Sequence, residues 1–303
     1  MGKYVNAFHD VIFLRRFYKN WFALSYQLLR YNGAVRQVKA TLRGGYEMQI
    51  DRYSTLLLAK LLSNGQATLD EDFAGTGLII IDCMGQKLKI KIVENNNYNG
   101  AVYGVFADHE YNFLSPFEGS TVIDVGANIG DSALYFICSG ADNVIALEPY
   151  PFSYKMAGYN LQSNNVNERV MLLNSGYGHN EVVNVTKSQA NGSKPLKNNG
   201  DSTSESMEVP TYSLKELLSL SNGDGTLLLK MDCEGCEYNL MHEDSEVLSR
   251  FSRIIIEYHY GPQHIPEKLE EAGFEVTFSK PVSIYNPDMP DPKTRQGMIY
   301  ASK

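Results

Sequence analysis

The chain has 303 residues, which is enough for one large domain and an N-terminal addition. Hydrophobic residues make up 43% of it and charged residues 20%, a composition that excludes a disordered chain. The net charge of −8 disfavours nucleic acid as a partner, because an acidic protein repels a phosphate backbone.

Apolar residues recur at helical spacing in residues 5–29, which predicts one or two amphipathic helices. Arg15, Arg16 and Lys19 interrupt every apolar run well before the ~20 residues that a transmembrane segment needs. The same charges disfavour a secretion signal, and Asn6 stands where N-myristoylation requires Ser or Thr. We expect these helices to pack against the main domain; a basic helix that binds a membrane surface or a partner is the alternative.

Two further elements complete the N-terminal region, which we assign to residues 1–100. A helix is predicted over residues 53–63, ending at Asn64-Gly65. Two β-rich runs at residues 78–83 and 87–93 surround a turn at Met84-Gly85, the pattern of a hairpin.

Residues 101–303 show short β-rich runs that alternate with helical stretches. The predicted strands cover residues 121–125, 143–147, 170–173, 226–231 and 253–257. This alternation predicts βαβ units and therefore an α/β domain with a doubly wound, mainly parallel sheet. Residues 187–208 are rich in Ser, Asn, Gly and Lys, so we expect a solvated loop or irregular hairpin, with a flap over the substrate as the alternative.

The first of these strands leads into a glycine-bearing turn that spans residues 124–131. Gly126 and Gly130 permit backbone conformations and close approaches that a Cβ atom would prevent. The fingerprint of dinucleotide-binding proteins requires glycines where Asn128 and Asp131 stand, and an aspartate opening the helix opposes a pyrophosphate. S-adenosylmethionine carries no phosphate, and its sulfonium and ammonium cations are compatible with Asp124 and Asp131. We therefore predict S-adenosylmethionine as the cofactor.

The next two strands supply further candidate contacts to the cofactor. Glu148 ends the second strand, 24 positions after Asp124, where a carboxylate can accept hydrogen bonds from both ribose hydroxyls. Ser175 and Gly176 follow the third strand and suit a close approach to adenine, although a plain turn would look the same. The predicted cofactor-binding residues are Asp124, Gly126, Ala127, Asn128, Gly130, Asp131, Glu148, Pro149, Ser175 and Gly176.

The fourth and fifth strands carry an unusual group of charged residues, which we interpret as the acceptor side of the site. A lysine in a buried strand needs a partner, and Asp232 and Glu257 are the expected partners of Lys230. The catalytic candidates are Lys230, Asp232, Glu234, Glu257 and His259, with Asp232 and His259 as possible proton acceptors. A structural ion-pair network is the alternative. No metal is required by this pattern, but a divalent ion held by Asp232 with Glu257 or His259 stays open.

The four cysteines, Cys83, Cys138, Cys233 and Cys236, are too few for a disulfide framework, so we expect a reducing, cytoplasmic location. Cys233 and Cys236 match Cys-x-x-Cys, but a structural zinc site needs four ligands and no second pair exists in the sequence. We therefore do not favour a zinc or redox centre.

The glycine loop and the later segment Lys230-Met-Asp-Cys-Glu-Gly-Cys-Glu237 together resemble the FkbM-type methyltransferase family. The resemblance extends over residues 103–259 and implies a class I methyltransferase, Rossmann-like fold. It also implies methyl transfer to oxygen on a glycan, sugar or small natural product. It assigns Asp124, Gly126, Asn128, Gly130 and Glu148 to the cofactor, and Lys230, Asp232 and Glu234 to the acceptor side.

Two other functions are weighed against this one. A degenerate methyltransferase domain could act as a binding or scaffolding module, but intact cofactor and acidic motifs disfavour that hypothesis. A nucleic-acid methyltransferase is disfavoured by the acidity of the chain and by the lack of an Asn/Asp-Pro-Pro-Tyr run after the fourth strand. The sequence leaves the oligomeric state open.

Overall fold

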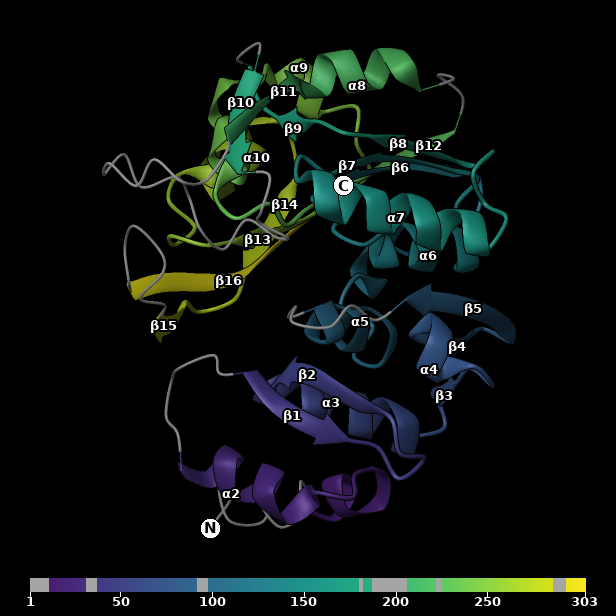
Figure 1. Cartoon of the computed structure of the whole chain (residues 1–303). Helices are drawn as coiled ribbons and strands as arrows, with labels where there is room; N and C mark the ends of the chain where they lie inside the picture. Colours follow the sequence, from purple (N-terminus) through teal and green to yellow (C-terminus); the bar gives the residue numbers. More distant parts are fainter. Residues whose placement is uncertain are drawn as a thin grey trace. The chain divides into compact units, whose positions relative to one another are not determined.

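The computed structural model describes residues 11–30, 37–91, 98–179, 182–186, 206–221, 225–285 and 293–303. The chain divides into two compact units, residues 1–110 and 111–303, each of which is described by itself (Figure 1). Most of the predicted loop at residues 187–208 lies outside the described residues.

The N-terminal unit contains the predicted helices and hairpin. After a helix at residues 11–17 come α2 (Trp21–Arg30), β1 (Gln37–Thr41), β2 (Glu47–Asp51), α3 (Arg52–Ser63), β3 (Ala67–Leu69), α4 (Phe73–Thr76), β4 (Leu78–Cys83), β5 (Gln86–Lys91) and α5 (Tyr98–Phe106). The predicted hairpin is the antiparallel pair β4–β5, and the predicted second helix is α3, so both predictions are confirmed. In the described part of the chain, no helix has the length and apolar character needed to cross a membrane.

The pair β1–β2 was not predicted, although its side chains alternate between buried and exposed positions. Val38, Ala40, Met48 and Ile50 are buried and the residues between them face outward. This period of two is the signal of a half-buried strand, and it extends over only five residues in each case. Such short runs are easily passed over in a sequence.

The second unit is built on a large central sheet. Its elements are η1 (Asn112–Leu114), β6 (Ser120–Val125), α6 (Asp131–Cys138), β7 (Asn143–Leu147), α7 (Pro151–Ser163), β8 (Val170–Leu173), β9 (Gly176–Tyr177), β10 (Val182–Thr186), β11 (Ser206–Tyr212), α8 (Leu214–Leu220), β12 (Thr226–Met231), η2 (Cys236–His242), α9 (Ser245–Leu248), β13 (Arg253–Tyr258), α10 (Ile265–Glu271), β14 (Glu275–Phe278), β15 (Val282–Tyr285) and β16 (Lys293–Ser302). All five predicted strands are present, as β6, β7, β8, β12 and β13.

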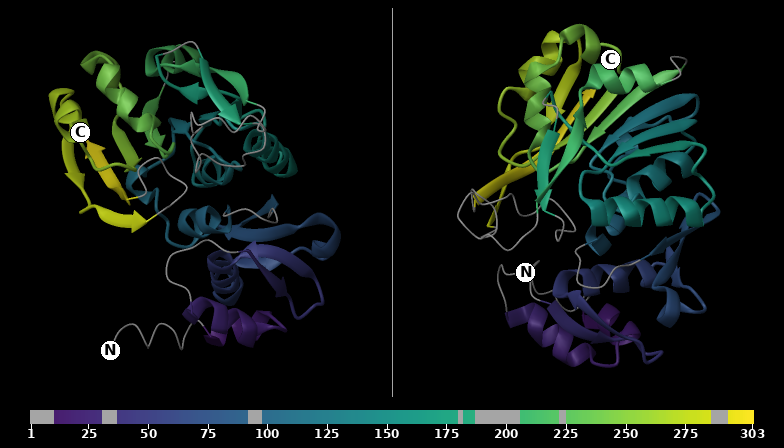
Figure 2. Two further views of the ribbon diagram at one scale, coloured as in Figure 1. Left: turned by 60° about the vertical axis from the view of Figure 1, so that its left-hand side comes forward. Right: turned by 45° about the horizontal axis from the view of Figure 1, so that its top comes forward.

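The strand order of the sheet is β14-β16-β13-β12-β6-β7-β8, and β15 pairs with β16. The five strands from β13 to β8 are parallel, and β16 is antiparallel to its neighbours. Helices α6 and α7 cover one face and α8 and α9 the other (Figures 1 and 2). The predicted doubly wound, mainly parallel α/β sheet is therefore confirmed.

This strand order places a ligand crevice between β6 and β12. From β6 the chain proceeds to β7 and β8 on one side, then returns to β12 on the other. Open α/β sheets bind ligands at the carboxyl ends of the strands, where the order reverses in this way. Every residue of β6 is buried, so the strand that leads into the crevice is held rigidly on both faces.

Gly126, which directly follows β6, packs tightly against the backbone that directly follows β12. Its φ is +84°, and a Cβ atom built on it would lie 1.8 Å from the backbone oxygen of Asp232. From the sequence, we expected Gly126 to permit an unusual backbone conformation and a close approach by another group. The structure adds that the approaching group is the chain's own backbone.

We expect Gly126→Ala to destabilise the second unit by about 3 kcal/mol or more, from left-handed strain together with overpacking. Gly273→Ala is the matched control, because Gly273 has a φ of +88° and nothing within 4 Å of its ideal Cβ position. The control carries only the strain, about 1 kcal/mol. Urea denaturation followed by circular dichroism measures both, and equal losses would contradict the close contact.

Candidate active site

A pocket with a cavity volume of about 320 Å³ opens at the carboxyl ends of the parallel strands. This volume falls within the range of roughly 300–1,000 Å³ that is usual for small-molecule sites. Five of the predicted site residues line the pocket: Gly126, Pro149, Ser175, Gly176 and Glu234. Strand β10 closes one side through Val182, Val183, Asn184 and Val185.

The charge of the pocket lining distinguishes between classes of ligand. Among the described residues that line it there is no lysine or arginine, and the one formally charged side chain is Glu234. A phosphate-bearing ligand would lack a cationic partner here, whereas a sulfonium or ammonium cation would not. This lining agrees with the choice of cofactor made from the sequence.

Glu148 holds the glycine loop from the neighbouring strand end. Its Oε2 atom accepts a hydrogen bond from the backbone N–H of Asn128 at 2.8 Å, and its Oε1 atom accepts one from Tyr150 N–H at 2.9 Å. Burial raises the pKa of Glu148 to about 8, against the opposing effect of these two donors. Glu148 therefore anchors the glycine loop to the end of β7, beside Pro149, which lines the pocket.

Ser175 offers another polar atom to a ligand. The residue is 1% exposed, and its hydroxyl has no hydrogen-bond partner among the described residues. A buried polar atom without a partner costs free energy unless a ligand or water satisfies it. The position of Ser175 in the pocket lining therefore fits a bound polar ligand.

Asp124 and Lys230 form a buried ion pair behind the glycine loop. The Lys230 Nζ atom lies 3.0 Å from Asp124 Oδ1 and donates to the backbone oxygen of Gly126 at 2.7 Å, while Ser132 donates to Asp124 Oδ2 at 2.6 Å. Burial alone would lower the pKa of Lys230, but the charges of Asp124 and Asp232 outweigh it and raise the pKa. Lys230 therefore stays protonated and fixes the glycine loop to β12.

The expected partners of Lys230 were Asp232 and Glu257, and this expectation needs correction. Asp124 forms the close ion pair because the parallel register sets Lys230 directly opposite Asp124 on β6, and Asp232 acts on the amine at longer range. Glu257 lies in β13, opposite Met298 of β16. The sequence did not reveal which strand lies beside β12, so the partner could not be identified from it.

Asp131, Ala127 and Gly130 complete the turn from β6 to α6. Asp131 is the first residue of α6 and is buried, and burial raises its pKa to about 7 although Lys230 opposes the shift. A Cβ atom on Gly130 would lie 3.2 Å from Ala157 Cα in α7. None of these three residues is among the described residues that line the pocket.

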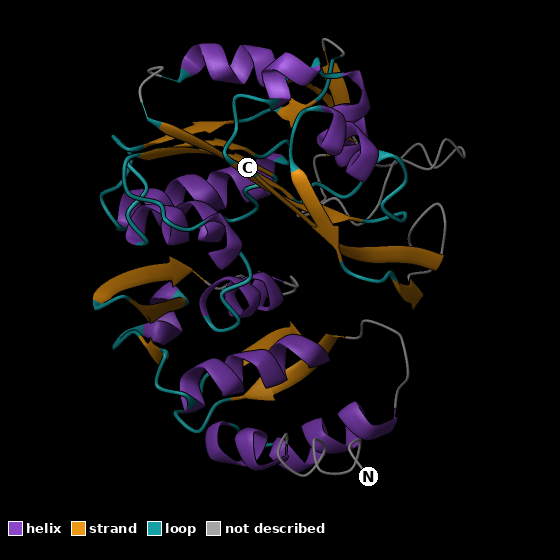
Figure 3. Ribbon diagram, turned by 180° about the vertical axis from the view of Figure 1, so that it is seen from behind, coloured by secondary structure: helices purple, strands orange, loops and turns teal. Residues whose placement is uncertain are grey.

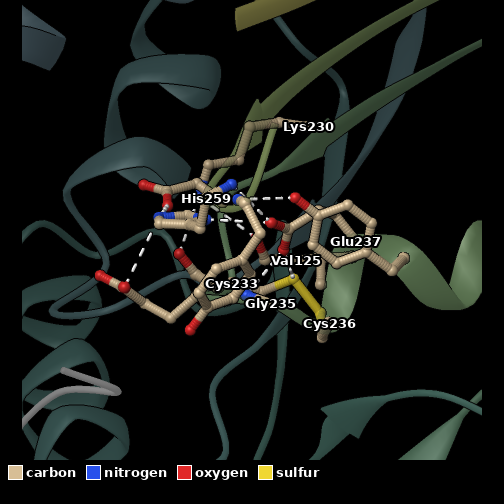
Figure 4. A network of polar contacts seen from close by, with 12 residues as sticks. Val125, Lys230, Cys233, Gly235, Cys236, Glu237 and His259 are labelled. Carbon is tan, nitrogen blue, oxygen red and sulfur yellow. Dashed lines mark hydrogen bonds and ion pairs between the residues drawn. A yellow bond between two sulfur atoms is a disulfide. The ribbon is translucent and has the colours of Figure 1, made fainter. Parts of the chain in front are cut away.

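His259 lies at the centre of an acidic cluster (Figure 4). Its Nδ1 atom is 3.0 Å from Glu237 Oε1, and its Nε2 atom is 3.5 Å from Glu234 Oε2 and 3.8 Å from Asp232 Oδ1. Burial would lower the pKa of His259, but these carboxylates raise it to about 10. His259 is therefore an imidazolium at neutral pH, which disfavours it as a proton acceptor.

Glu237 is the site residue whose role the sequence did not reveal. Its side chain is fully buried and accepts hydrogen bonds from the backbone N–H groups of Gly235 at 2.8 Å and His259 at 3.0 Å, in addition to its contact with the imidazole. It thus ties the turn after β12 to the end of β13. The one feature of the sequence that pointed to Glu237 was its position as the last acidic residue of the segment from Lys230 to Glu237.

Cys233 and Cys236 form a disulfide within this turn, and both line the pocket. This bond was not predicted from the sequence. In this state the two sulfurs are not available as metal ligands. In the described residues, moreover, no three His, Cys, Asp or Glu side chains are arranged to hold a metal ion.

Comparisons with known proteins identify similar chains. The sequence model described as the methyltransferase FkbM domain matches residues 124–276, which include both motifs. The hexuronic acid methyltransferase AglP of Haloferax volcanii is 29% identical over 168 residues, which cover 54% of this chain and 66%, slightly under two thirds, of that relative.

Solved structures show a distant likeness. Precorrin-6y C5,15-methyltransferase from Geobacter metallireducens has a TM-score of 0.39 and 13% identity, over 66% of this chain and 88% of that one. The precorrin 8W decarboxylase from Methanobacterium thermoautotrophicum has a TM-score of 0.37 and 14% identity, over 64% and 87%.

The buried ion pair generates a stability prediction. Lys230→Met should cost about 3–5 kcal/mol of unfolding free energy, because it leaves the Asp124 carboxylate buried without a counter-charge. The double variant Asp124→Asn/Lys230→Met should recover part of this loss, since both charges are then absent. Urea denaturation of Asp124→Asn, Lys230→Met and the double variant, together with the wild type, gives a double-mutant cycle. A loss below about 1 kcal/mol in Lys230→Met would contradict the assigned pairing.

Proposed function

We propose that this chain, which belongs to the FkbM methyltransferase family, methylates a hydroxyl oxygen of a sugar, glycan or small natural product. The observation that carries the proposal is the position of Asp232. This carboxylate is 32% exposed, directly precedes a residue that lines the pocket, and is held near the His259 imidazolium. A hydroxyl must lose its proton during methyl transfer, and Asp232 can accept it.

The residues present fit S-adenosylmethionine as the methyl donor. Glu148, at the strand end beside the pocket-lining Pro149, is the proposed acceptor for the ribose hydroxyls. Among the described residues, the Ser175 hydroxyl has no partner and the pocket lining includes no lysine or arginine. When bound, S-adenosylmethionine supplies an electrophilic methyl group on a sulfonium. Gly126 would border the donor, and Glu234 contributes negative charge to the same pocket.

The chain's own residues then have separate tasks. Asp232 orients the acceptor hydroxyl and takes its proton, which contributes on the order of 100- to 10,000-fold to the rate. His259 is a positioning residue, because its charge holds Asp232 and Glu234 while Glu237 holds its ring. Alignment of the hydroxyl with the methyl group supplies the rest of the acceleration.

The proposed sugar acceptor is supported by the similarity to a hexuronic acid methyltransferase. A uronic acid offers both hydroxyl and carboxylate oxygens, and a carboxylate needs no proton acceptor. The role proposed for Asp232 therefore favours a hydroxyl. The product distinguishes the two, because a methyl ether withstands mild alkali and a methyl ester does not.

The test is methyl transfer from labelled S-adenosylmethionine into fractionated glycans and small molecules, with the product identified by mass spectrometry before and after mild alkali. Once an acceptor is known, Asp232→Asn should lower the single-turnover rate at least about 100-fold. Its affinity for S-adenosylhomocysteine should persist. Glu234→Gln is the comparison, because it removes the other carboxylate near His259 Nε2. A rate within about threefold of wild type, far short of the general-base range, or an alkali-labile product, would exclude this role for Asp232.

We expect Glu148→Ala to weaken the binding of S-adenosylhomocysteine by about 1–3 kcal/mol, because it removes a desolvated acceptor. It should also lower the thermal midpoint, since two backbone N–H groups lose their acceptor. Titration calorimetry gives the affinity. Glu168→Ala, which removes an exposed glutamate, is the control and should change neither quantity. Unchanged affinity in a folded Glu148→Ala protein would refute the ribose contact.

A further inference from the structure

The N-terminal part of the chain has a charge opposite to that of the whole protein. Residues 11–46 include no aspartate or glutamate, although the whole chain has a net charge of −8. The basic residues of this stretch number seven: Arg15, Arg16, Lys19, Arg30, Arg36, Lys39 and Arg43. Such a local excess of positive charge in an acidic protein indicates an anionic partner.

The first two helices expose apolar side chains beside these charges. The inward residues Leu14, Tyr18 and Leu24 are buried, whereas the outward residues Ile12, Phe22 and Tyr26 are 50%, 72% and 52% exposed. We call the exposed set the basic–aromatic face; its members are Ile12, Arg15, Arg16, Lys19, Phe22 and Tyr26. Figure 3 shows the two helices one after the other at the N-terminal end of the chain.

Local contacts keep the positive charges together at this face. The Arg43 guanidinium donates two hydrogen bonds to the Arg15 carbonyl oxygen, at 3.1 and 2.7 Å, and so adds a further charge beside the face. The Arg15 guanidinium lies 5.8 Å from the centre of the Trp21 ring. Lys39, by contrast, is paired with Glu47 at 2.6 Å and contributes less free charge.

We propose that the basic–aromatic face binds the surface of an anionic membrane. A bilayer interface accepts both components, since aromatic and aliphatic side chains enter the boundary of the acyl chains while Lys and Arg contact anionic headgroups. A nucleic-acid duplex would use the charges but would leave Ile12 and Phe22 exposed, because its bases are stacked on one another. This inference does not depend on methyl transfer, and it concerns the N-terminal unit alone.

Trp21 provides a direct test, because it is the single tryptophan of the chain and opens α2. The full-length protein is titrated with vesicles of phosphatidylcholine alone, and with vesicles that also contain about 30% phosphatidylserine. We expect a blue shift of Trp21 emission and co-sedimentation with the anionic vesicles only, reduced by added salt. Absence of both on anionic vesicles overturns the proposal.

Two pairs of substitutions separate the components of the face. Arg15→Gln/Arg16→Gln should weaken vesicle binding about 25-fold, at roughly fivefold for each charge. Phe22→Ser/Tyr26→Ser should reduce binding at every salt concentration. Lys155→Gln/Lys215→Gln removes two exposed charges from α7 and α8 and is the matched control, expected to bind like wild type. Thermal midpoints establish that every variant is folded.

The same variants can overturn the proposal. If both face variants bind anionic vesicles as the control does, the face is not the membrane site. If sedimentation velocity without lipid shows a dimer that Phe22→Ser/Tyr26→Ser abolishes, the face is an interface between two copies of the chain and the proposal fails.

Discussion

The buried ion pair between Asp124 and Lys230 is the constraint on which the site depends. It joins β6 to β12 at the point where the strand order of the sheet reverses, and Lys230 also holds the backbone oxygen of Gly126. Two buried charges are tolerated only because each satisfies the other and Ser132 satisfies a remaining oxygen. The glycine loop and the acidic segment therefore have one common anchor, and neither can shift without breaking it.

Charge is distributed in two layers around the pocket. The inner layer is the Asp124–Lys230 pair, which lies behind the glycine loop and is closed to solvent. The outer layer is the His259 imidazolium among Asp232, Glu234 and Glu237. Because the folded-state pKa of His259 is above its usual 6.5, this charge stabilises the fold at low pH, and its contribution is lost as the pH rises toward about 10.

Local patterns in the sequence predicted the five parallel strands of the central sheet and five of the residues that line the pocket. Strands β6, β7, β8, β12 and β13 were identifiable because each is a compact β-rich run between helical stretches. The partner of Lys230 was not, because it depends on the pairing of β12 with β6, which are about a hundred residues apart in the chain. Glu237 was also missed as a positioning residue, since its contacts to Gly235 and His259 require the tertiary fold.

The small sheet β10-β11-β9 has a consequence for how this protein could acquire new acceptors. Gly176 and Tyr177 of β9 pair in parallel register with Thr211 and Tyr212 of β11. The chain segment that connects β9 to β11 therefore has its two ends side by side. When the ends of a segment are already held together, a change in its length costs little free energy. Insertions there would reshape one wall of the pocket while the anchored loop and the acidic turn stay in position, which makes this segment the natural place for evolutionary divergence in acceptor choice.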